Sequence, residues 1–161
     1  MRRTDRQITD PGHMETILQN AACLRLGLVD GGLAYIVPMS FGMRVEDGKL
    51  CLYFHSAPQG RKIELIEEAG IASFEADTDI GIIQANQACA FSSSYQSVMG
   101  HGKIEILHDE ADKLHALRIL MEHYTGQDAW EIPTQSLDGV AAIKLTVEAM
   151  TGKASPASEA L

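Results

Sequence analysis

The sequence predicts an antiparallel β-barrel with helices packed on its outside. Seven or so extended runs are spread along the 161 residues, and most neighbouring runs are joined by hairpin turns. Helical patterns lie between some of these runs, and no internal repeat divides the chain. Strands linked mainly by hairpins, with a few interspersed helices, favour an antiparallel barrel over a parallel α/β fold.

The first predicted element is a helix. Asp10 followed by Pro11 marks its start, because an N-cap carboxylate then precedes a proline at the first helical position. Apolar side chains recur at helical spacing behind this cap, which predicts one buried face. That face consists of Met14, Ile17, Leu18 and Ala21.

Two hairpins follow the helix. Apolar runs at residues 23–29 and 33–41 flank an Asp-Gly-Gly turn, and a second Asp-Gly turn at residues 47–48 leads into the run 49–57. Asp-Gly between two apolar runs is a strong hairpin signal. Pro38 has no N–H to donate to a sheet, so its position predicts a strand edge or an irregularity.

The second half of the chain predicts two helices and three further strands. The segment 80–90 has no clear pattern, and glycines at positions 100 and 102 mark possible bends in the long strand. The predicted elements are a short helix at 61–68 ended by Gly70, strands at 71–75 and 95–107, an amphipathic helix from Asp109 to Gly126, and a last strand at 140–147.

Composition restricts the classes of partner. The formal net charge is −9, with 22 acidic and 13 basic residues, so the overall field repels nucleic acid and anionic membranes. No apolar run is long enough to cross a bilayer and no signal peptide is evident, so we expect a cytoplasmic protein. One domain at residues 1–153 with a flexible tail at 154–161 fits the length, and the three cysteines are expected to be buried free thiols.

The segment YFHSAPQGRK, residues 53–62, is the most informative stretch. A strand ends there, a glycine-containing loop turns, and a helix begins with Arg61 and Lys62. A helix N-terminus presents unpaired N–H groups and partial positive charge, which suits a phosphate. Two adjacent cations at this end oppose the helix dipole unless an anion joins them. The alternative is a solvated first turn, and spacing alone does not separate the two.

Four segments resemble one known family. The sequences MRRTDR at 1–6, YFHSAPQGRK at 53–62, YQSVMGHGKIE at 95–105 and EAMTGK at 148–153 are similar to the 5-nitroimidazole-resistance (Nim-type) flavoproteins of the pyridoxamine 5'-phosphate oxidase-like split-barrel superfamily. The match keeps its order over nearly the whole chain. It implies a six-stranded antiparallel split β-barrel, and a homodimer with two FMN sites at its interface.

The resemblance also implies the cofactor-binding residues. The flavin ring is expected to lie along the strands at residues 38–41 and 54–56, and its phosphate is expected to meet Arg61 and Lys62. The strand at residues 96–98 is expected to lie close by, and residues of the other subunit are expected to complete the pocket. The positions that match are Pro38, Met39, Ser40, Phe41, Phe54, His55, Ser56, Arg61, Lys62, Gln96, Ser97 and Val98.

His55 is the candidate catalytic residue. The resemblance places it at a strand end facing the cofactor, where an imidazole with a pKa near 6.5 is able to give a proton to a substrate undergoing reduction. The alternative is that His55 has a purely structural role, with its hydrogen bonds made within the protein. None of the histidine pairs in the long helix has the i, i+4 spacing of a metal site, so no metal is expected. Tyr124 is expected in the core, and Trp130 in the core or at an interface.

Three functions remain open at this stage. The first is an FMN-dependent reductase acting on nitroaromatic or related small electron acceptors, and the second is a flavin-binding or sensing protein without turnover. The third is a haem-binding member of the same superfamily with a histidine as axial ligand. No Gly-x-Gly-x-x-Gly fingerprint follows a strand, so no Rossmann nicotinamide domain is expected.

Overall fold

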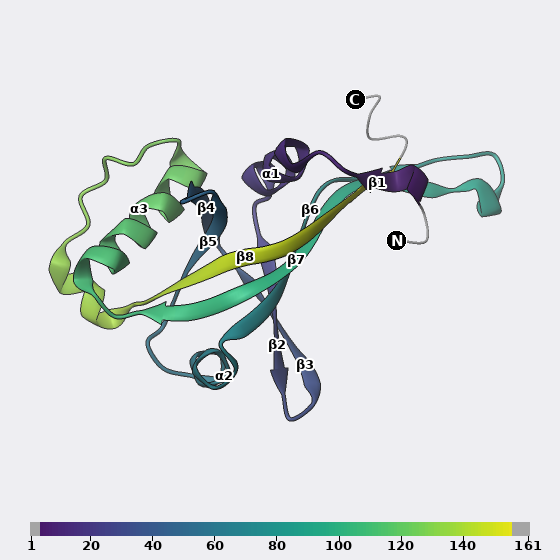
Figure 1. The fold of residues 1–161 in the computed structure, drawn as a ribbon. Helices are drawn as coiled ribbons and strands as arrows, with labels where there is room; N and C mark the ends of the chain where they lie inside the picture. The colour runs from purple at the N-terminus through teal and green to yellow at the C-terminus, as the bar shows by residue number, and fades with distance from the viewer. Residues whose placement is uncertain (1–3, 156–161) are drawn as a thin grey trace.

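The structure is a computed structural model that describes residues 4–155 apart from the side chain of Asp79. Its strands and helices form one sheet with helices around it (Figure 1). The strands are β1 (Gln7–Ile8), β2 (Leu24–Asp30), β3 (Leu33–Met39), β4 (Phe41–Glu46), β5 (Lys49–Ser56), β6 (Ile71–Ile83), β7 (Ser92–Leu107) and β8 (Ala141–Ala154). The helices are α1 (Pro11–Asn20), α2 (Arg61–Ala69) and α3 (Glu110–Thr125), with 3-10 turns η1 (Thr4–Arg6), η2 (Ala88–Ala90) and η3 (Thr134–Gly139).

The sheet is a split antiparallel barrel. Its strand order is β3-β2-β6-β7-β8-β5-β4, with β1 paired to β8, and every pairing is antiparallel. β3 and β4 stand at opposite ends of this order, yet Ser40 alone separates them in the chain. Counted as one bent strand, β3 and β4 join the two ends of the sheet. With the two-residue β1 left aside, this gives six strands and confirms the predicted fold class.

Turn chemistry fixes both predicted hairpins. Gly31 and Gly32 have φ values of 58° and 85° between β2 and β3, and Asp47 and Gly48 have 50° and 75° between β4 and β5. Two successive residues with positive φ match the twist of the flanking strands. Pro38 lies on β3, which ends the strand order and is paired on one side with β2. The expectation of an edge position is therefore confirmed.

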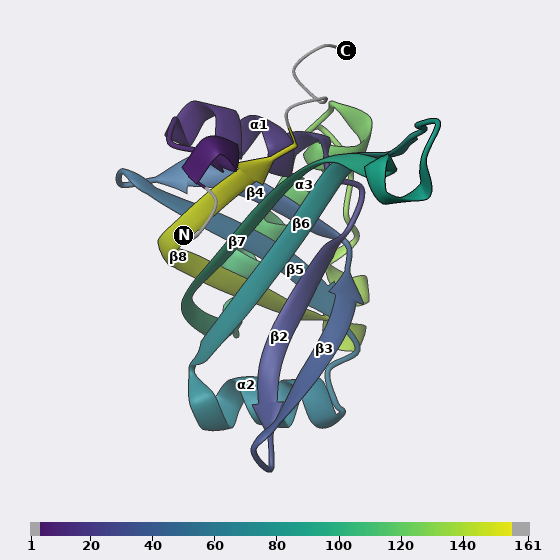
Figure 2. The same ribbon diagram turned by 90° about the vertical axis from the view of Figure 1, so that its right-hand side faces the viewer.

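Three helices pack against the barrel. α1 lies across one end and buries Met14, Ile17 and Leu18, and the Asp10 side chain accepts hydrogen bonds from two first-turn amides. α2 lies at the opposite end (Figure 2). α3 packs on the outside of β4 and β5, where its backbone lies so close that a Cβ added to Gly42 would be 2.5 Å from the Ile119 carbonyl oxygen.

Four sequence expectations need correction. β6 and β7 extend through the segment without a clear pattern and form a long hairpin, because a ladder of cross-strand pairs reaches to Ile83 and Ser92. β8 continues to Ala154 rather than ending at residue 147. Ser155 is buried within the predicted tail, and residues 156–161 lie outside the described residues. Of the cysteines, which are all free, Cys51 is buried, Cys23 half-buried and Cys89 exposed.

Candidate functional site

The N-terminus of α2 has the features of an anion site. Gly60, the N-cap residue, has φ 129° and supplies no side chain to cap the helix. Its carbonyl oxygen accepts the N–H groups of Ile63 and Glu64 at 2.9 and 3.3 Å. The N–H groups of Arg61 and Lys62 have no backbone acceptor in the part of the chain described. First-turn amides of this kind attract anions.

Arg61 already has anionic partners. Its guanidinium donates two hydrogen bonds to the Asp30 carboxylate at the end of β2, one of them 3.0 Å long, and a third of 2.9 Å to Glu64. Asp30 first, and then Glu64, raise the pKa of Arg61 above its ordinary value. All three side chains are largely exposed. The predicted phosphate ligand is therefore neutralised by carboxylates that the sequence places 31 residues earlier and three residues later.

Lys62 is in the opposite situation. Its side chain is half-buried, and burial lowers its pKa below the ordinary value. Nζ lies 3.2 Å from the Sδ atom of Met39, a weak acceptor. No carboxylate among the described residues forms an ion pair with it. A cation held in this way gains most from an anionic ligand, because burial has removed solvent without supplying a counter-charge.

The bend between β3 and β4 lies beside the end of β5. Phe41 pairs with Phe54 on the last rung between β4 and β5, and Ser40 at the bend and His55 on β5 each adjoin this rung in the chain. Alternation directs successive side chains to opposite faces. Ser40, His55 and Pro38 are exposed on the outer face. Met39, Phe41 and Phe54 are buried in one hydrophobic core. Ser56 is half-buried.

This alternation divides the predicted flavin-contacting residues into two groups. Pro38, Ser40 and His55 present their side chains to a ligand on the outer face. The phenylalanines, at 0% and 1% exposure, offer such a ligand only their backbone. Their side chains instead pack beneath the bend and fix its shape. None of the three main hollows formed by the described residues is lined by Pro38, Ser40 or His55.

The C-terminal turn of α3 fixes the same bend. The Tyr124 hydroxyl accepts a hydrogen bond from the Phe41 N–H and donates one to the Ala22 carbonyl oxygen, both 3.1 Å long. The His123 ring lies 4.6 Å from the Phe41 ring and its Nε2 atom is 3.0 Å from the Ala21 carbonyl oxygen. Tyr124 is 43% exposed, so the expectation of a core residue is wrong. The sequence carries no signal of this long-range hydrogen bond.

Trp130 lies outside the core. It is 45% exposed, and its Nε1–H donates a 3.0 Å hydrogen bond to the Thr125 hydroxyl at the end of α3. This short-range hydrogen bond ties the indole to the segment after the helix.

The third predicted strand lies at the far end of the barrel from α2. Gln96 Oε1 accepts a 2.7 Å hydrogen bond from Nε2 of the His13 ring on α1, Ser97 pairs with Asp77, and Val98 is fully buried. Gln96 is opposite Thr78 on β6, whereas α2 ends next to Ile71, the first residue of that strand. At roughly 3.3 Å per residue, Thr78 is about 23 Å from the C-terminal end of α2. Lys62 lies at the other end of α2, where its Nζ contacts Met39.

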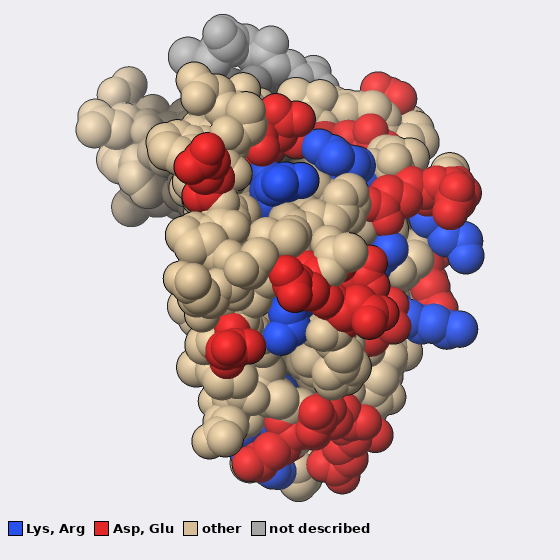
Figure 3. Space-filling model, turned by 90° about the vertical axis from the view of Figure 1, so that its left-hand side faces the viewer, with Lys and Arg blue, Asp and Glu red and all other residues tan. Residues whose placement is uncertain are grey.

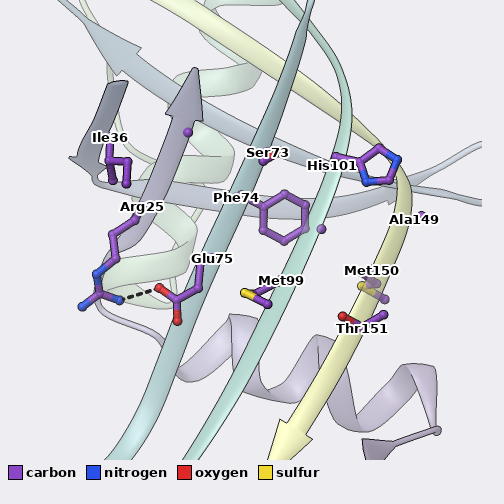
Figure 4. A pocket seen from close by; sticks show the side chains of 12 residues that line it. Arg25, Ile36, Ser73, Phe74, Glu75, Met99, His101, Ala149, Met150 and Thr151 are labelled. Atoms are coloured by element: carbon purple, nitrogen blue, oxygen red, sulfur yellow. Dashed lines mark hydrogen bonds and ion pairs between the residues drawn. The ribbon is translucent and has the colours of Figure 1, made fainter. Parts of the chain in front are cut away.

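An apolar hollow lies between these ends on the outer face of β2, β3, β6, β7 and β8 (Figure 4). Its volume is about 590 Å³. Arg25 lies at its side, ion-paired with Glu75 at 3.0 Å and with Asp77. Burial, then the neighbouring Asp77, raise the pKa of Glu75. The lining residues include Ile36, Ser73, Met99, His101, Ala149, Met150 and Thr151.

A separate polar cluster lies beside α3. Glu46 contacts Lys144 and the His115 ring, each at 2.8 Å, and borders a hollow of about 440 Å³. Burial alone would raise the pKa of Glu46, but hydrogen bonds from Lys144, Tyr53 and His115 lower it to about 2. Charges of both signs are interspersed on the face shown in Figure 3. The described residues hold no group of three or more His, Cys, Asp or Glu side chains arranged for a metal.

None of the described helices is long and apolar enough to span a membrane.

The bent β3–β4 strand, the ladder order and the outer helices define the chain as a split-barrel protein. Residues 10–154 match the family model described as pyridoxamine 5'-phosphate oxidase, and the chain belongs to this family. A candidate 5-nitroimidazole antibiotic resistance protein from Bacteroides thetaiotaomicron is 33% identical, with a TM-score of 0.79 and coverage of 92% of this chain and 86% of that one. The resemblance found in the sequence is thereby confirmed.

Two more distant structures share the fold. The flavocytochrome Anf3 from Azotobacter vinelandii is 20% identical, with a TM-score of 0.80 over 96% of this chain and 72% of that one. An FAD and haem binding protein from Mycobacterium smegmatis is 21% identical, with a TM-score of 0.79 over 94% of this chain and 74% of that one. A search of the curated proteins gave no match.

Proposed function

We propose that the chain binds FMN and uses it to reduce nitroaromatic or related small electron acceptors. The observation that supports this most directly is Lys62, a half-buried cation that has no carboxylate partner among the described residues and lies at a helix N-terminus without a side-chain cap. A phosphate joined to a planar ring satisfies both features, because the phosphate meets the cation and the free amides while the ring extends along the strands. The similar candidate 5-nitroimidazole resistance protein favours a nitro compound as substrate.

Each residue then has a definite task. Lys62 and the first-turn amides of α2 hold the phosphate. Arg61 remains paired with Asp30 and forms the edge of the phosphate site. Pro38, Ser40 and His55 are exposed, and the flavin ring is expected along the two strands that carry them. FMN supplies the electron transfer when it is bound. His55, exposed at the end of β5, supplies the proton that the reduced acceptor takes up.

The proposal includes a homodimer. Gln96 lies beside His13 of α1, away from the C-terminal end of α2, and the family resemblance implies that residues of a second subunit complete the flavin site. The apolar outer hollow offers a surface for the second copy. Ile36 and Met99 at this hollow are 66% and 58% exposed, and apolar side chains exposed together are typical of an association surface.

Haem is the second candidate ligand. His101 lies at the apolar hollow with Met99 and Met150 (Figure 4), and histidine and methionine are both known axial ligands of haem iron. The Mycobacterium smegmatis protein of similar fold binds FAD and haem. Flavin at the α2 end and haem at the hollow occupy different parts of the barrel, so the two proposals are separable.

The absorption spectrum of the purified protein, followed by titration, tests the proposal. We expect flavin bands, or quenching of FMN fluorescence when the protein is added to free FMN, and turnover of a nitroimidazole when a reductant is supplied. A Soret band without flavin binding would favour haem. Flavin binding without turnover would leave the second alternative, a flavin-binding protein that is not a reductase.

A further inference from the structure

Ser40, the residue that joins β3 to β4, has backbone groups that are available to a ligand. It is exposed, and neither its N–H nor its carbonyl oxygen forms a backbone hydrogen bond within the part of the chain that the structure describes. The strands on its two sides belong to opposite ends of the sheet order, so no single ladder holds the residue. Backbone donors and acceptors need a partner, and the polar edge of a planar ring compound supplies one.

The Tyr124 hydroxyl fixes the peptide unit that follows Ser40. It accepts a 3.1 Å hydrogen bond from the Phe41 N–H and donates one of 3.1 Å to the Ala22 carbonyl oxygen. One oxygen atom therefore joins the end of α3, the link between α1 and β2, and the start of β4, and Figure 1 shows α3 beside β4.

This hydrogen bond also orients the carbonyl group of Ser40. The Phe41 N–H and the Ser40 carbonyl belong to one planar trans peptide unit, in which the N–H and the carbonyl point in opposite directions. Because the N–H is held by Tyr124, the Ser40 carbonyl oxygen points away from α3. A side chain 83 residues later in the chain thus sets the direction of an exposed acceptor.

His123 packs against the same strand start. Its ring lies 4.6 Å from the Phe41 ring, and its Nε2–H donates a 3.0 Å hydrogen bond to the Ala21 carbonyl oxygen. Its Nδ1 atom is buried and has no hydrogen-bond partner among the described residues. A buried acceptor without a donor costs stability and is uncommon in proteins. The end of α3 therefore holds the bend at some cost, which is typical of residues that shape a functional site.

We propose that Tyr124 is a positioning residue for the flavin ring. Its hydroxyl holds the peptide between Ser40 and Phe41 so that the Ser40 carbonyl oxygen accepts a hydrogen bond from the polar edge of the ring. The inference rests on the proposed function for the identity of the ligand. It also divides the work between two helices, because the end of α3 orients the ring whereas the start of α2 holds the phosphate.

This division gives a specific test, because riboflavin has the ring of FMN without its phosphate. Tyr124→Phe keeps the aromatic ring and removes only the hydroxyl oxygen. The affinities for FMN and riboflavin should fall by the same factor, roughly three- to tenfold, and the visible absorption bands of the bound flavin should shift. Unchanged affinities, or a loss for FMN alone, would overturn the proposal.

Thr125→Val is the matched control. It removes a hydroxyl from the same turn of α3, but the hydrogen bonds of this hydroxyl go to Met121, Gln127 and Trp130 and none reaches the bend. Both flavin affinities and the flavin spectrum should therefore stay the same. A loss in Thr125→Val as large as in Tyr124→Phe would show a general effect of loosening α3 and would overturn the positioning role.

Amide hydrogen exchange of the flavin-free protein gives a second measurement. The Phe41 N–H should exchange roughly tenfold faster in Tyr124→Phe than in the unmodified protein, and at an unchanged rate in Thr125→Val. An unchanged exchange rate in Tyr124→Phe would refute the hold on this peptide. Faster exchange with unchanged affinities for both flavins would refute the positioning role and leave the proposed function intact. An unmodified protein that binds neither flavin would refute the proposed function and this inference with it.

Discussion

Replacing Lys62 by glutamine should separate binding from folding. The substitution keeps most of the side-chain length and removes the charge that lies 3.2 Å from Met39 Sδ. A charge-assisted hydrogen bond contributes about 1.5–3 kcal/mol, so FMN affinity should fall roughly 10- to 150-fold. The free protein should lose no stability, because the lysine ammonium is half-buried without an anionic partner among the described residues.

Two further variants make the result specific. Lys49→Gln, at an exposed lysine on β5, removes the same charge from the whole protein and should leave FMN affinity unchanged. Arg61→Gln should weaken FMN binding less than Lys62→Gln, because Asp30 and Glu64 already occupy the guanidinium. Flavin fluorescence gives the affinities and urea unfolding the stabilities. If Lys62→Gln and Lys49→Gln bound FMN equally well, the phosphate would not lie at α2.

Three other perturbations are informative. Gly42→Ala should cost about 1–3 kcal/mol by pushing α3 from the sheet, whereas Gly139→Ala, with open space around the new Cβ, should cost less in the same urea unfolding assay. Glu46 has its folded-state pKa lowered from 4.5 to about 2, so its contribution is present above pH 4.5 and is lost as the pH falls toward 2. The difference in thermal stability between the unmodified protein and Glu46→Gln should therefore be about 1 kcal/mol at pH 7 and vanish near pH 2; a constant difference would contradict this assignment. His55→Gln should slow nitro reduction about 10²- to 10⁴-fold, a far larger effect than on FMN affinity, and an unchanged rate would remove His55 as the proton donor.

Local chemistry made much of the fold predictable. Asp-Gly turns require positive φ wherever they occur, so both hairpins follow from a few residues. Pro38 cannot donate to a sheet on either side of its strand, which restricts it to an edge. The Asp10 cap depends only on the amides that follow it. In each case the controlling interaction lies within three or four residues.

The candidate site was less predictable because its controlling interactions are distant in sequence. The Asp30–Arg61 pair and the Phe41–Tyr124 hydrogen bond join residues far apart in the chain, and no local pattern records them. The sequence alone places Lys62 next to Arg61 as an equal cation. The fold makes them different, since one is neutralised and exposed while the other is half-buried beside Met39.

The long β6–β7 hairpin was missed for a related reason. Residues 80–90 carry no alternation of apolar and polar side chains, because this end of the hairpin has no buried face. The family resemblance grouped Gln96 with the cations at α2, and the structure places Gln96 in a hydrogen bond with His13 of α1.

The central claim is that the α2 end of the barrel binds a phosphate attached to a flavin. Comparing the affinities of the unmodified protein for FMN and for riboflavin, which has the same ring system and no phosphate, tests it most directly. We expect FMN to bind at least roughly tenfold more tightly, since the phosphate gains Lys62 and the free amides of the first turn. Equal affinities for the two flavins would contradict the account.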